Sequence, residues 1–249
     1  MTKYAAFGAT LDAGIQQVET ATIVITTVTA GDANFILTAA GMTGSAITTA
    51  VTLANGDSAD TVATKAVAAM NLVANITAWF KVEAHGPYIV LTRLVAAAND
   101  ATMNLAYADD SSGGLTDDAT SDATTAGVAA VEIAAVTNIS GPGLSADTED
   151  VTSHDSTAAF EEHVVTILRS GEVTLDIVYD PAAATHSATE GGLIYKLENR
   201  QFTWFDLTFL TTYNWTFSGY VTGFEPGMPV DGALTASVTI KITGQPVLE

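Results

Sequence analysis

The sequence contains no cysteine and very few basic residues. Without cysteine it can form neither disulfides nor thiolate metal sites. Only eight lysines and arginines stand against 28 acidic residues, which gives a formal net charge of −20. Proteins that bind nucleic acid tightly use lysine and arginine to displace counterions from phosphate. The composition therefore speaks against tight DNA binding.

Long apolar runs are missing as well. No stretch approaches the roughly 18 apolar residues of a membrane span. The segment from Met1 to Gly14 lacks the continuous apolar region of a signal peptide. We therefore expect a soluble protein without an export signal or membrane span. Hydrophobic residues make up 48% and charged residues 14%, which is typical of a folded chain with a real core.

Threonine- and valine-rich segments with alternating polarity predict a mainly β protein. Glu172–Tyr179 alternates with Val173, Leu175 and Ile177 on one face, and residues 234–243 do so over a longer stretch. Further strands are predicted at residues 3–14, 22–28, 34–39, 47–53, 77–84, 88–94, 103–107, 202–209 and 215–222. The polar segment 109–125 reads as a linker.

Two helices are predicted. Residues 58–74 show apolar positions at helical spacing, and either Ser58 or Asp57 has the side chain of an N-cap. A shorter helix through Leu193 and Leu197 follows Ser187 and Glu190, which have the spacing of a capping box.

The stretch Val136–Ser156 contains a short strand, the corner Gly141-Pro142-Gly143 and a polar run. Proline followed by glycine predicts a type II turn. The run from Ser145 to Thr157 has no apolar period, which predicts a long exposed loop.

This stretch, ISGPGLSADTEDVTSHDS, is followed by GEVTL at 171–175 and by FSGYVTGFEPGMPVDGALTASVTIKITGQP near the end. Together these blocks resemble the major tail tube protein of long-tailed, siphovirus-type bacteriophages. The resemblance covers Lys3–Gly14 and Val128–Glu249. The family's minimal form lacks the material in between.

The resemblance implies a discontinuous tail-tube domain at residues 1–14 and 127–249. Its fold would be a β-sandwich or barrel with one short helix and a long stacking loop. Residues 15–126 would be an inserted α+β domain that faces outward and decorates the tube, because a bulky addition at the lumen would block DNA.

The function that the resemblance implies is that of a structural virion protein, without enzymatic activity or cofactor. Homo-hexameric rings would stack into a helical tail tube whose acidic lumen conducts genome DNA into the bacterial host without binding it tightly. Partners would include the tape measure protein and the tail terminator and baseplate proteins. Assembly would take place in the host cytoplasm.

The resemblance also implies roles for two groups of residues. The inter-ring stacking loop would comprise Asp147, Glu149, Asp150, Thr152, His154, Asp155 and Phe160. The tube-scaffold strand would comprise Leu234, Ala236, Val238, Ile240 and Ile242.

Other functions remain open from the residues alone. An adhesin-like surface module would explain the acidic, threonine-rich composition, and a tube protein of a contractile tail or secretion system would share the fold. Ser153-His154-Asp155 has triad residue types, but neighbouring residues on one strand point in alternating directions. A metal site built on Glu161, Glu162 and His163 with His154 lacks the H-E-x-x-H motif of zinc sites. Asp147, Glu149 and Asp150 offer oxygen ligands for a weak cation site.

Overall fold

The computed structural model describes residues 8–156, 160–209 and 213–248. The chain divides into two compact units, Gly14–Ala129 on the one hand and Met1–Ala13 with Ala130–Glu249 on the other. Each unit has its own cluster of buried apolar side chains. In the ranges that the structure describes, none of the helices has the length and apolar character needed to span a membrane.

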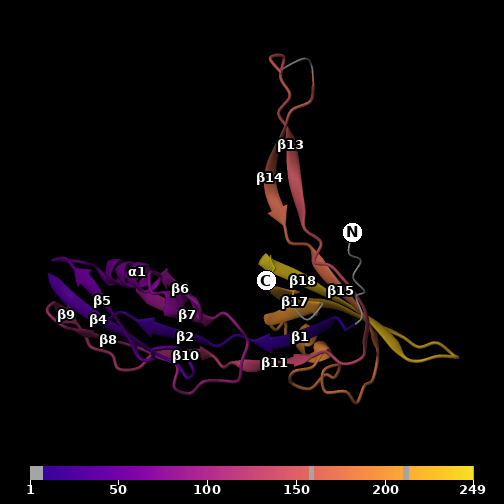
Figure 1. The fold of residues 1–249 in the computed structure, drawn as a ribbon, viewed down its shortest axis with the longest axis horizontal. Helices are drawn as coiled ribbons and strands as arrows, with labels where there is room; N and C mark the ends of the chain where they lie inside the picture. Colours follow the sequence, from indigo (N-terminus) through magenta and orange to yellow (C-terminus); the bar gives the residue numbers. More distant parts are fainter. Residues whose placement is uncertain (1–7, 157–159, 210–212, 249) are drawn as a thin grey trace. The chain divides into compact units, whose positions relative to one another are not determined.

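The unit Gly14–Ala129, the insert unit, holds three small sheets and two helices (Figure 1). One sheet has the order β10-β2-β7-β6, a second β5-β4-β8, and the third pairs β3 with β9. The strands are β2 Val18–Thr22, β3 Ile25–Thr29, β4 Gly31–Thr38, β5 Ile47–Leu53, β6 Phe80–His85, β7 Tyr88–Arg93, β8 Asn104–Asp109, β9 Gly113–Leu115 and β10 Asp122–Thr125. The predicted strand at residues 47–53 and the predicted hairpin around His85-Gly86-Pro87 are confirmed.

Helix α1 spans Ala59–Met70 and packs against β5, β6 and β7. Of the two predicted N-cap residues, Ser58 is the one that caps the helix, because its hydroxyl accepts a hydrogen bond from the Thr61 amide at 3.2 Å. The prediction that the helix continues to residue 74 is wrong. It ends at Met70 with Asn71 as its C-cap, and a separate short helix, α2, begins at Ala74 and ends at Thr77.

Two further predictions in this unit are wrong. Residues 22–28 do not form one strand, because the chain leaves β2 after Thr22 and enters β3, in a different sheet, at Ile25. The segment 109–125 is not a linker, since β9 pairs with β3 and β10 pairs with β2. These strands are short and polar, and only their partners identify them.

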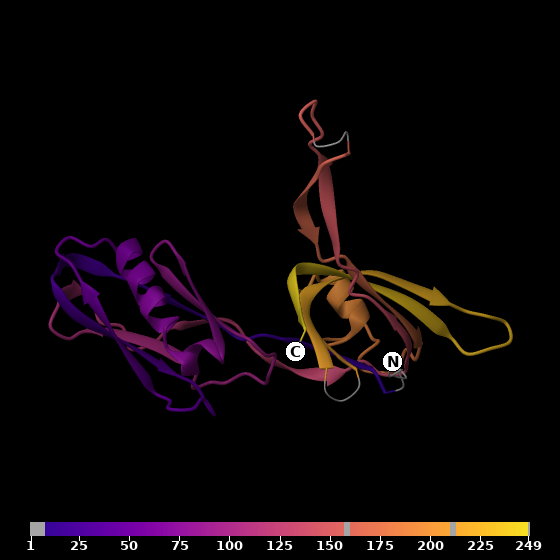
Figure 2. The same cartoon turned by 45° about the horizontal axis from the view of Figure 1, so that its top comes forward.

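The unit of Met1–Ala13 and Ala130–Glu249, the sheet unit, is built on one sheet of seven strands (Figure 2). The order is β11-β1-β16-β17-β18-β15-β12. The bounds are β1 Thr10–Ile15, β11 Val128–Glu132, β12 Val136–Ser140, β15 Glu172–Val178, β16 Thr203–Phe209, β17 Tyr213–Gly227 and β18 Thr235–Leu248. The mainly β fold class is thus confirmed. Of the strand predicted at residues 3–14, residues 3–7 lie outside the described residues.

One face of this sheet forms the core of the unit. Val173, Leu175 and Ile177 of β15 are fully buried there, as the alternation predicted. Helix α3, Leu193–Glu198, contributes Leu193 to the same cluster and lies against β17. The predicted short helix through Leu193 and Leu197 is therefore confirmed.

The capping box predicted for α3 is wrong. Gly192 occupies the N-cap without a side-chain hydrogen bond, and the Ser187 hydroxyl instead donates to the Ala184 carbonyl at 3.0 Å. The loop before α3 is anchored by buried His186. Its Nε2 lies 2.8 Å from the Ala134 carbonyl, and its Nδ1 accepts from the Asp180 amide at 3.2 Å, so Nε2 carries the proton.

Candidate assembly surfaces

A β-hairpin stands apart from the seven-stranded sheet of its unit (Figures 1 and 2). Strand β13, Ser145–Asp150, pairs antiparallel with β14, His163–Arg169, and neither strand belongs to another sheet. We call the described residues 144–156 and 160–169 the arm. The predicted loop is wrong for Ser145–Asp150, because backbone pairing with β14 makes a strand of a sequence without apolar period.

The corner at the base of the arm also differs from the predicted type II turn. That turn requires a positive φ at Gly143, but the positive φ, 110°, belongs to Gly141. A Cβ atom at Gly141 would lie 2.5 Å from the Glu172 carbonyl oxygen. Glycine is therefore required here by both backbone conformation and close approach.

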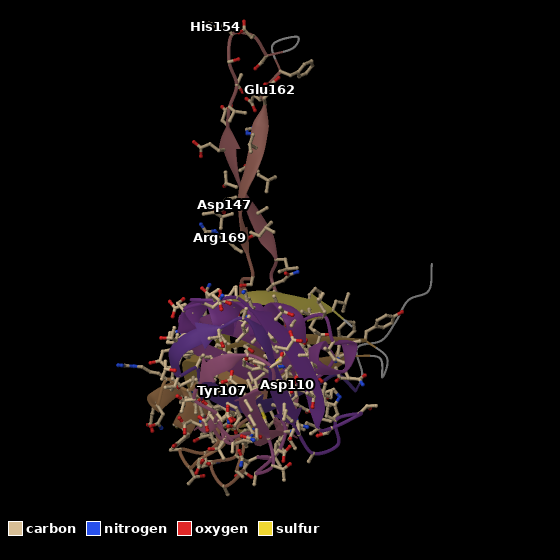
Figure 3. All side chains as sticks on the ribbon, turned by 90° about the vertical axis from the view of Figure 1, so that its left-hand side faces the viewer. Tyr107, Asp110, Asp147, His154, Glu162 and Arg169 are labelled. Atoms are coloured by element: carbon tan, nitrogen blue, oxygen red, sulfur yellow. The ribbon has the colours of Figure 1, made fainter. Side chains whose placement is uncertain are left out.

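An ion pair joins the two strands of the arm (Figure 3). The Arg169 guanidinium donates from Nε to both carboxylate oxygens of Asp147 at 2.9 Å, and from Nη2 to Oδ2 at 2.5 Å. This contact lowers the pKa of Asp147. Because both side chains are well exposed, the ion pair fixes the relative position of the two strands more than it stabilises the hairpin.

The outer part of the arm is polar. The Asp150 carboxylate accepts hydrogen bonds from the Thr152 side chain and amide, which lower the pKa of Asp150. The Thr152 hydroxyl in turn accepts from the Glu162 amide at 2.9 Å across the hairpin. His154 and Asp155 lie in an exposed turn beyond these contacts.

This turn does not bring together a catalytic or metal-binding group. The Asp155 amide donates to the Ser153 hydroxyl at 3.3 Å. This local contact stabilises the turn. His163 lies 3.5 Å from Glu161. Across the part of the chain that is described, no three histidine, aspartate or glutamate side chains gather as metal ligands.

The arm also carries an apolar surface that the sequence analysis did not single out. Every residue of β14 is exposed, although Val164, Val165, Ile167 and Leu168 occupy four of its seven positions. Leu168 is 80% exposed, and Phe160 at the outer end is 74% exposed. The sequence does carry a signal for this surface. Apolar residues occupy both faces of the strand, and this apolar run directly follows an acidic loop.

The face of the seven-stranded sheet that points away from the core is acidic. Its side chains alternate with core residues, and the acids among them are Asp12, Glu132, Glu172, Asp176, Asp206 and Glu225. Burial raises the pKa of Asp12, and the charges of Asp206 and Glu132 raise it further. Lys241 supplies a base on this face, where its Nζ lies 3.9 Å from Glu172 Oε2. We call this surface the acidic face.

The predicted scaffold residues lie mostly on the opposite side of the same sheet. Ala236, Val238, Ile240 and Ile242 of β18 are buried in the core. Leu234 precedes the strand and is exposed. The predicted stacking residues all lie on the arm, apart from the predicted scaffold residues.

Comparisons with known proteins add the following. Residues 116–249 match the model of the family described as "Lambda phage tail tube protein, TTP". No curated protein matches the sequence significantly.

Among solved structures, a chain of the virion of a native gene transfer agent particle is similar with a TM-score of 0.40 and 15% identity. The match covers 48% of this chain and 88% of that one. A chain from the baseplate of the anti-feeding prophage gives a TM-score of 0.37 and 10% identity, over 48% of this chain and 83% of that one. Because the family model spans more than half of the 249 residues, the chain belongs to the lambda phage tail tube proteins, which are structural components of the virion tail.

Proposed function

We propose that this subunit forms homo-hexameric rings that stack into a tube, and that the arm contacts the neighbouring ring. The observation that carries the proposal is the exposed apolar surface of β14. A lone two-stranded hairpin is marginally stable in water, and apolar side chains on both of its faces need a partner to cover them. A second copy of this subunit supplies that partner in a stack.

The edges of the seven-stranded sheet support ring formation. Strands β11 and β12 stand at its two ends, and neither has a second neighbour in this sheet among the described strands. The edge of a sheet presents backbone groups that can pair with another chain. Neighbouring subunits in a ring would join their sheets into one continuous barrel, which removes such edges. In this arrangement the scaffold residues of β18 stabilise the wall of the barrel, because they pack into the core on one side of the sheet.

The acidic face is proposed to line the lumen. DNA phosphates are repelled by a wall of carboxylates, so the genome slides past without sticking. The formal net charge of −20 is consistent with that role. The tube would thereby conduct DNA into the bacterial host.

The proposed domain organisation assigns residues 1–14 and 127–249 to the tube and residues 15–126 to a decoration on its outer surface. A folded insert at the lumen would obstruct DNA, whereas the outside leaves it room. Further proposed partners are the tape measure protein inside the tube and the terminator and baseplate proteins at its ends. Assembly is placed in the cytoplasm of the host.

Negative-stain electron microscopy of the purified protein over a range of concentrations tests this proposal, together with its mass in solution. Hollow tubes or six-fold rings are the expected result. A stable dimer or trimer that never forms rings at any concentration would contradict it.

The acids of the arm provide a variant test. We expect their replacement to shorten or abolish tubes while the subunit stays folded, because the arm loses its ion pair and its polar contacts to the next ring. The variant carries Asp147→Ala, Glu149→Ala, Asp150→Ala and Asp155→Ala. A matched control removes four exposed acids elsewhere, at Asp60, Asp110, Glu190 and Glu198. Tubes of normal length from the arm variant would refute the assigned role.

A further inference from the structure

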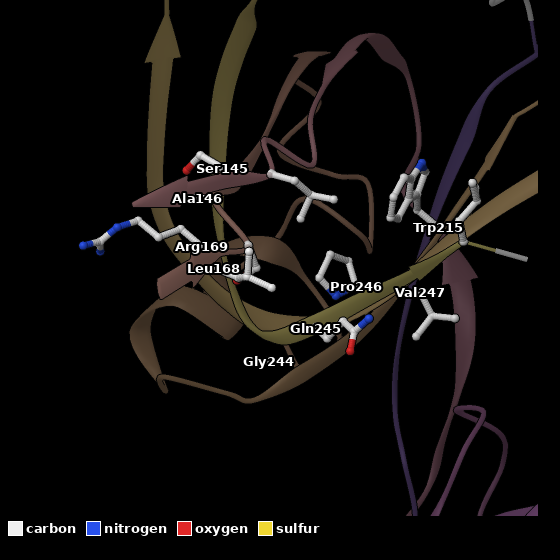
Figure 4. Close-up of a pocket in the computed structure, with 12 residues that line it drawn as sticks. Ser145, Ala146, Leu168, Arg169, Trp215, Gly244, Gln245, Pro246 and Val247 are labelled. Carbon is white, nitrogen blue, oxygen red and sulfur yellow. The ribbon is translucent and has the colours of Figure 1, made fainter. Parts of the chain in front are cut away.

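An apolar groove lies at the base of the arm. Its volume is about 930 Å³. Its apolar lining comes from the arm and from the ends of β17 and β18, namely Leu144, Leu168, Trp215, Pro246, Val247 and Leu248. Figure 4 shows Leu168, Trp215 and Pro246 around the same hollow. Arg169 is the charged residue of the lining.

The opposite end of the same two strands forms an exposed apolar tip. The β17–β18 ladder runs as far as the pair Gly227 and Thr235, and the chain turns between them. In this turn Met228 is 72% exposed, and Val230 is fully exposed. Pro226 and Pro229 restrict the backbone on either side of Met228, so the tip loses little freedom when it binds.

Groove and tip are therefore the two ends of one antiparallel ribbon. Trp215 pairs with Leu248 at the groove end, and Gly227 pairs with Thr235 at the tip end. A copy displaced along the strand direction brings its tip to the groove of the first. Such a contact is heterologous, which means that it leaves a free tip and a free groove and repeats without limit.

Charge also matches between the two surfaces. The segment 225–234 contains Glu225 and Asp231 and no basic residue. The groove offers Arg169, whose side chain is 60% exposed and whose guanidinium also pairs with Asp147. The tip is thus an acidic loop with an apolar end, and the groove is an apolar hollow with one arginine at its rim.

We propose that the groove binds the tip of a second copy of this chain, with Val230 and Met228 inserted between Leu168 and Trp215. This inference deepens the proposed stacking function and rests on it, since it names a second contact between successive copies. The contact shares Leu168 with the apolar surface of β14, but the element that inserts is the turn of β17 and β18 and not the arm.

Cross-linking tests the contact directly, because the natural chain has no cysteine. The full-length double variant Val230→Cys/Leu168→Cys is oxidised with copper phenanthroline at assembling concentrations and separated without reductant. A ladder of dimers, trimers and higher species is expected. Each single variant alone should give no ladder, and an equimolar mixture of the two should give a dimer that contains one chain of each.

Two further pairs serve as controls. Leu72→Cys/Leu168→Cys combines the groove with an exposed leucine of the insert unit and should give no ladder. Phe160→Cys/Val247→Cys asks whether the outer end of the arm fills the groove. A ladder from that pair, with none from the tip pair, would overturn the proposal.

Microscopy of the same samples separates this inference from the proposed function. Tubes without a ladder from the tip pair overturn the tip–groove contact and leave the tube intact. A ladder from linear chains that never close into rings upholds the contact and overturns the hexameric tube. Neither ladder nor tubes at the highest concentration overturns both.

Discussion

The apolar surface of β14 yields a quantitative prediction. The double variant Val165→Thr/Ile167→Thr keeps β-branched side chains, and so the strand propensity, while it replaces apolar groups by hydroxyls. Val165 is 59% exposed and Ile167 is 57% exposed, so more than half of each side chain is available to a partner. Full burial of such a residue contributes about 1.5–3 kcal/mol, so the exposed part contributes about 1 kcal/mol each.

The loss on assembly is therefore about 2 kcal/mol per subunit, which corresponds to an increase of about 30-fold in the critical concentration for tube formation. The isolated subunit should unfold at an unchanged temperature, because both side chains are already in contact with water. Sedimentation of tubes across a dilution series measures the first quantity, and circular dichroism of the dilute subunit measures the second.

A matched control makes the same type of change in the insert unit. Val24→Thr/Val95→Thr removes two exposed valines of similar accessibility and should leave the critical concentration unaltered. An arm variant that assembles as readily as this control, with equal thermal stability, would refute the burial of β14 between copies.

Three further predictions concern the folded subunit. His186→Ala should lower the free energy of unfolding by about 2–4 kcal/mol, because it opens a cavity and leaves the Ala134 carbonyl and the Asp180 amide without partners. Chemical denaturation measures this free energy. Gly31→Ala should destabilise the insert unit by about 2–4 kcal/mol, since φ is 149° and the new Cβ would collide with the backbone at Ser111; a thermal midpoint equal to that of the natural protein would contradict this. Asp12→Asn should raise the thermal midpoint at neutral pH. The raised pKa means that ionisation of Asp12 opposes folding above that pKa. The penalty disappears as pH falls through it, so the advantage of asparagine should vanish once the pH lies below the ordinary pKa of an aspartate.

Regular local patterns were sufficient to predict much of the fold. Strand β5 and the start of α1 at Ser58 follow from apolar spacing and an N-cap, which act over a few residues. The alternation of β15 was equally informative, because one of its faces is fully buried. In these elements the sequence neighbours alone determine the outcome.

Elements that depend on a distant partner were missed. Strand β10 is entirely exposed and has the sequence of a loop, yet it pairs with β2 about a hundred residues earlier, where the hydroxyls of Thr20 and Thr124 lie 2.8 Å apart. Strand β13 is an acidic segment that becomes a strand only because β14 lies opposite. No local pattern could indicate either pairing.

The candidate surfaces also divide into features that the local sequence reveals and features that depend on distant residues. The acids of the arm were visible as a polar run, but the groove brings together residues 144–146, 168–170, 215 and 244–248, which only the fold makes neighbours. The tip was not singled out in the sequence, and the exposure of Met228 and Val230 follows from the fold alone.

The neighbouring positions of β1 and β11 in the sheet have a consequence for protein engineering. The chain leaves β1 for the insert unit and returns through β11, and the Ile133 amide, just after β11, donates to the carbonyl of Leu11 in β1 at 2.8 Å. In topological terms the two strands form a hairpin whose turn is an entire folded unit. Because a hairpin closes with a turn of as few as about two residues, the insert can be exchanged for a short turn or for a foreign domain with closely spaced ends. Each subunit would then display one copy of that cargo, at a density set by the tube itself.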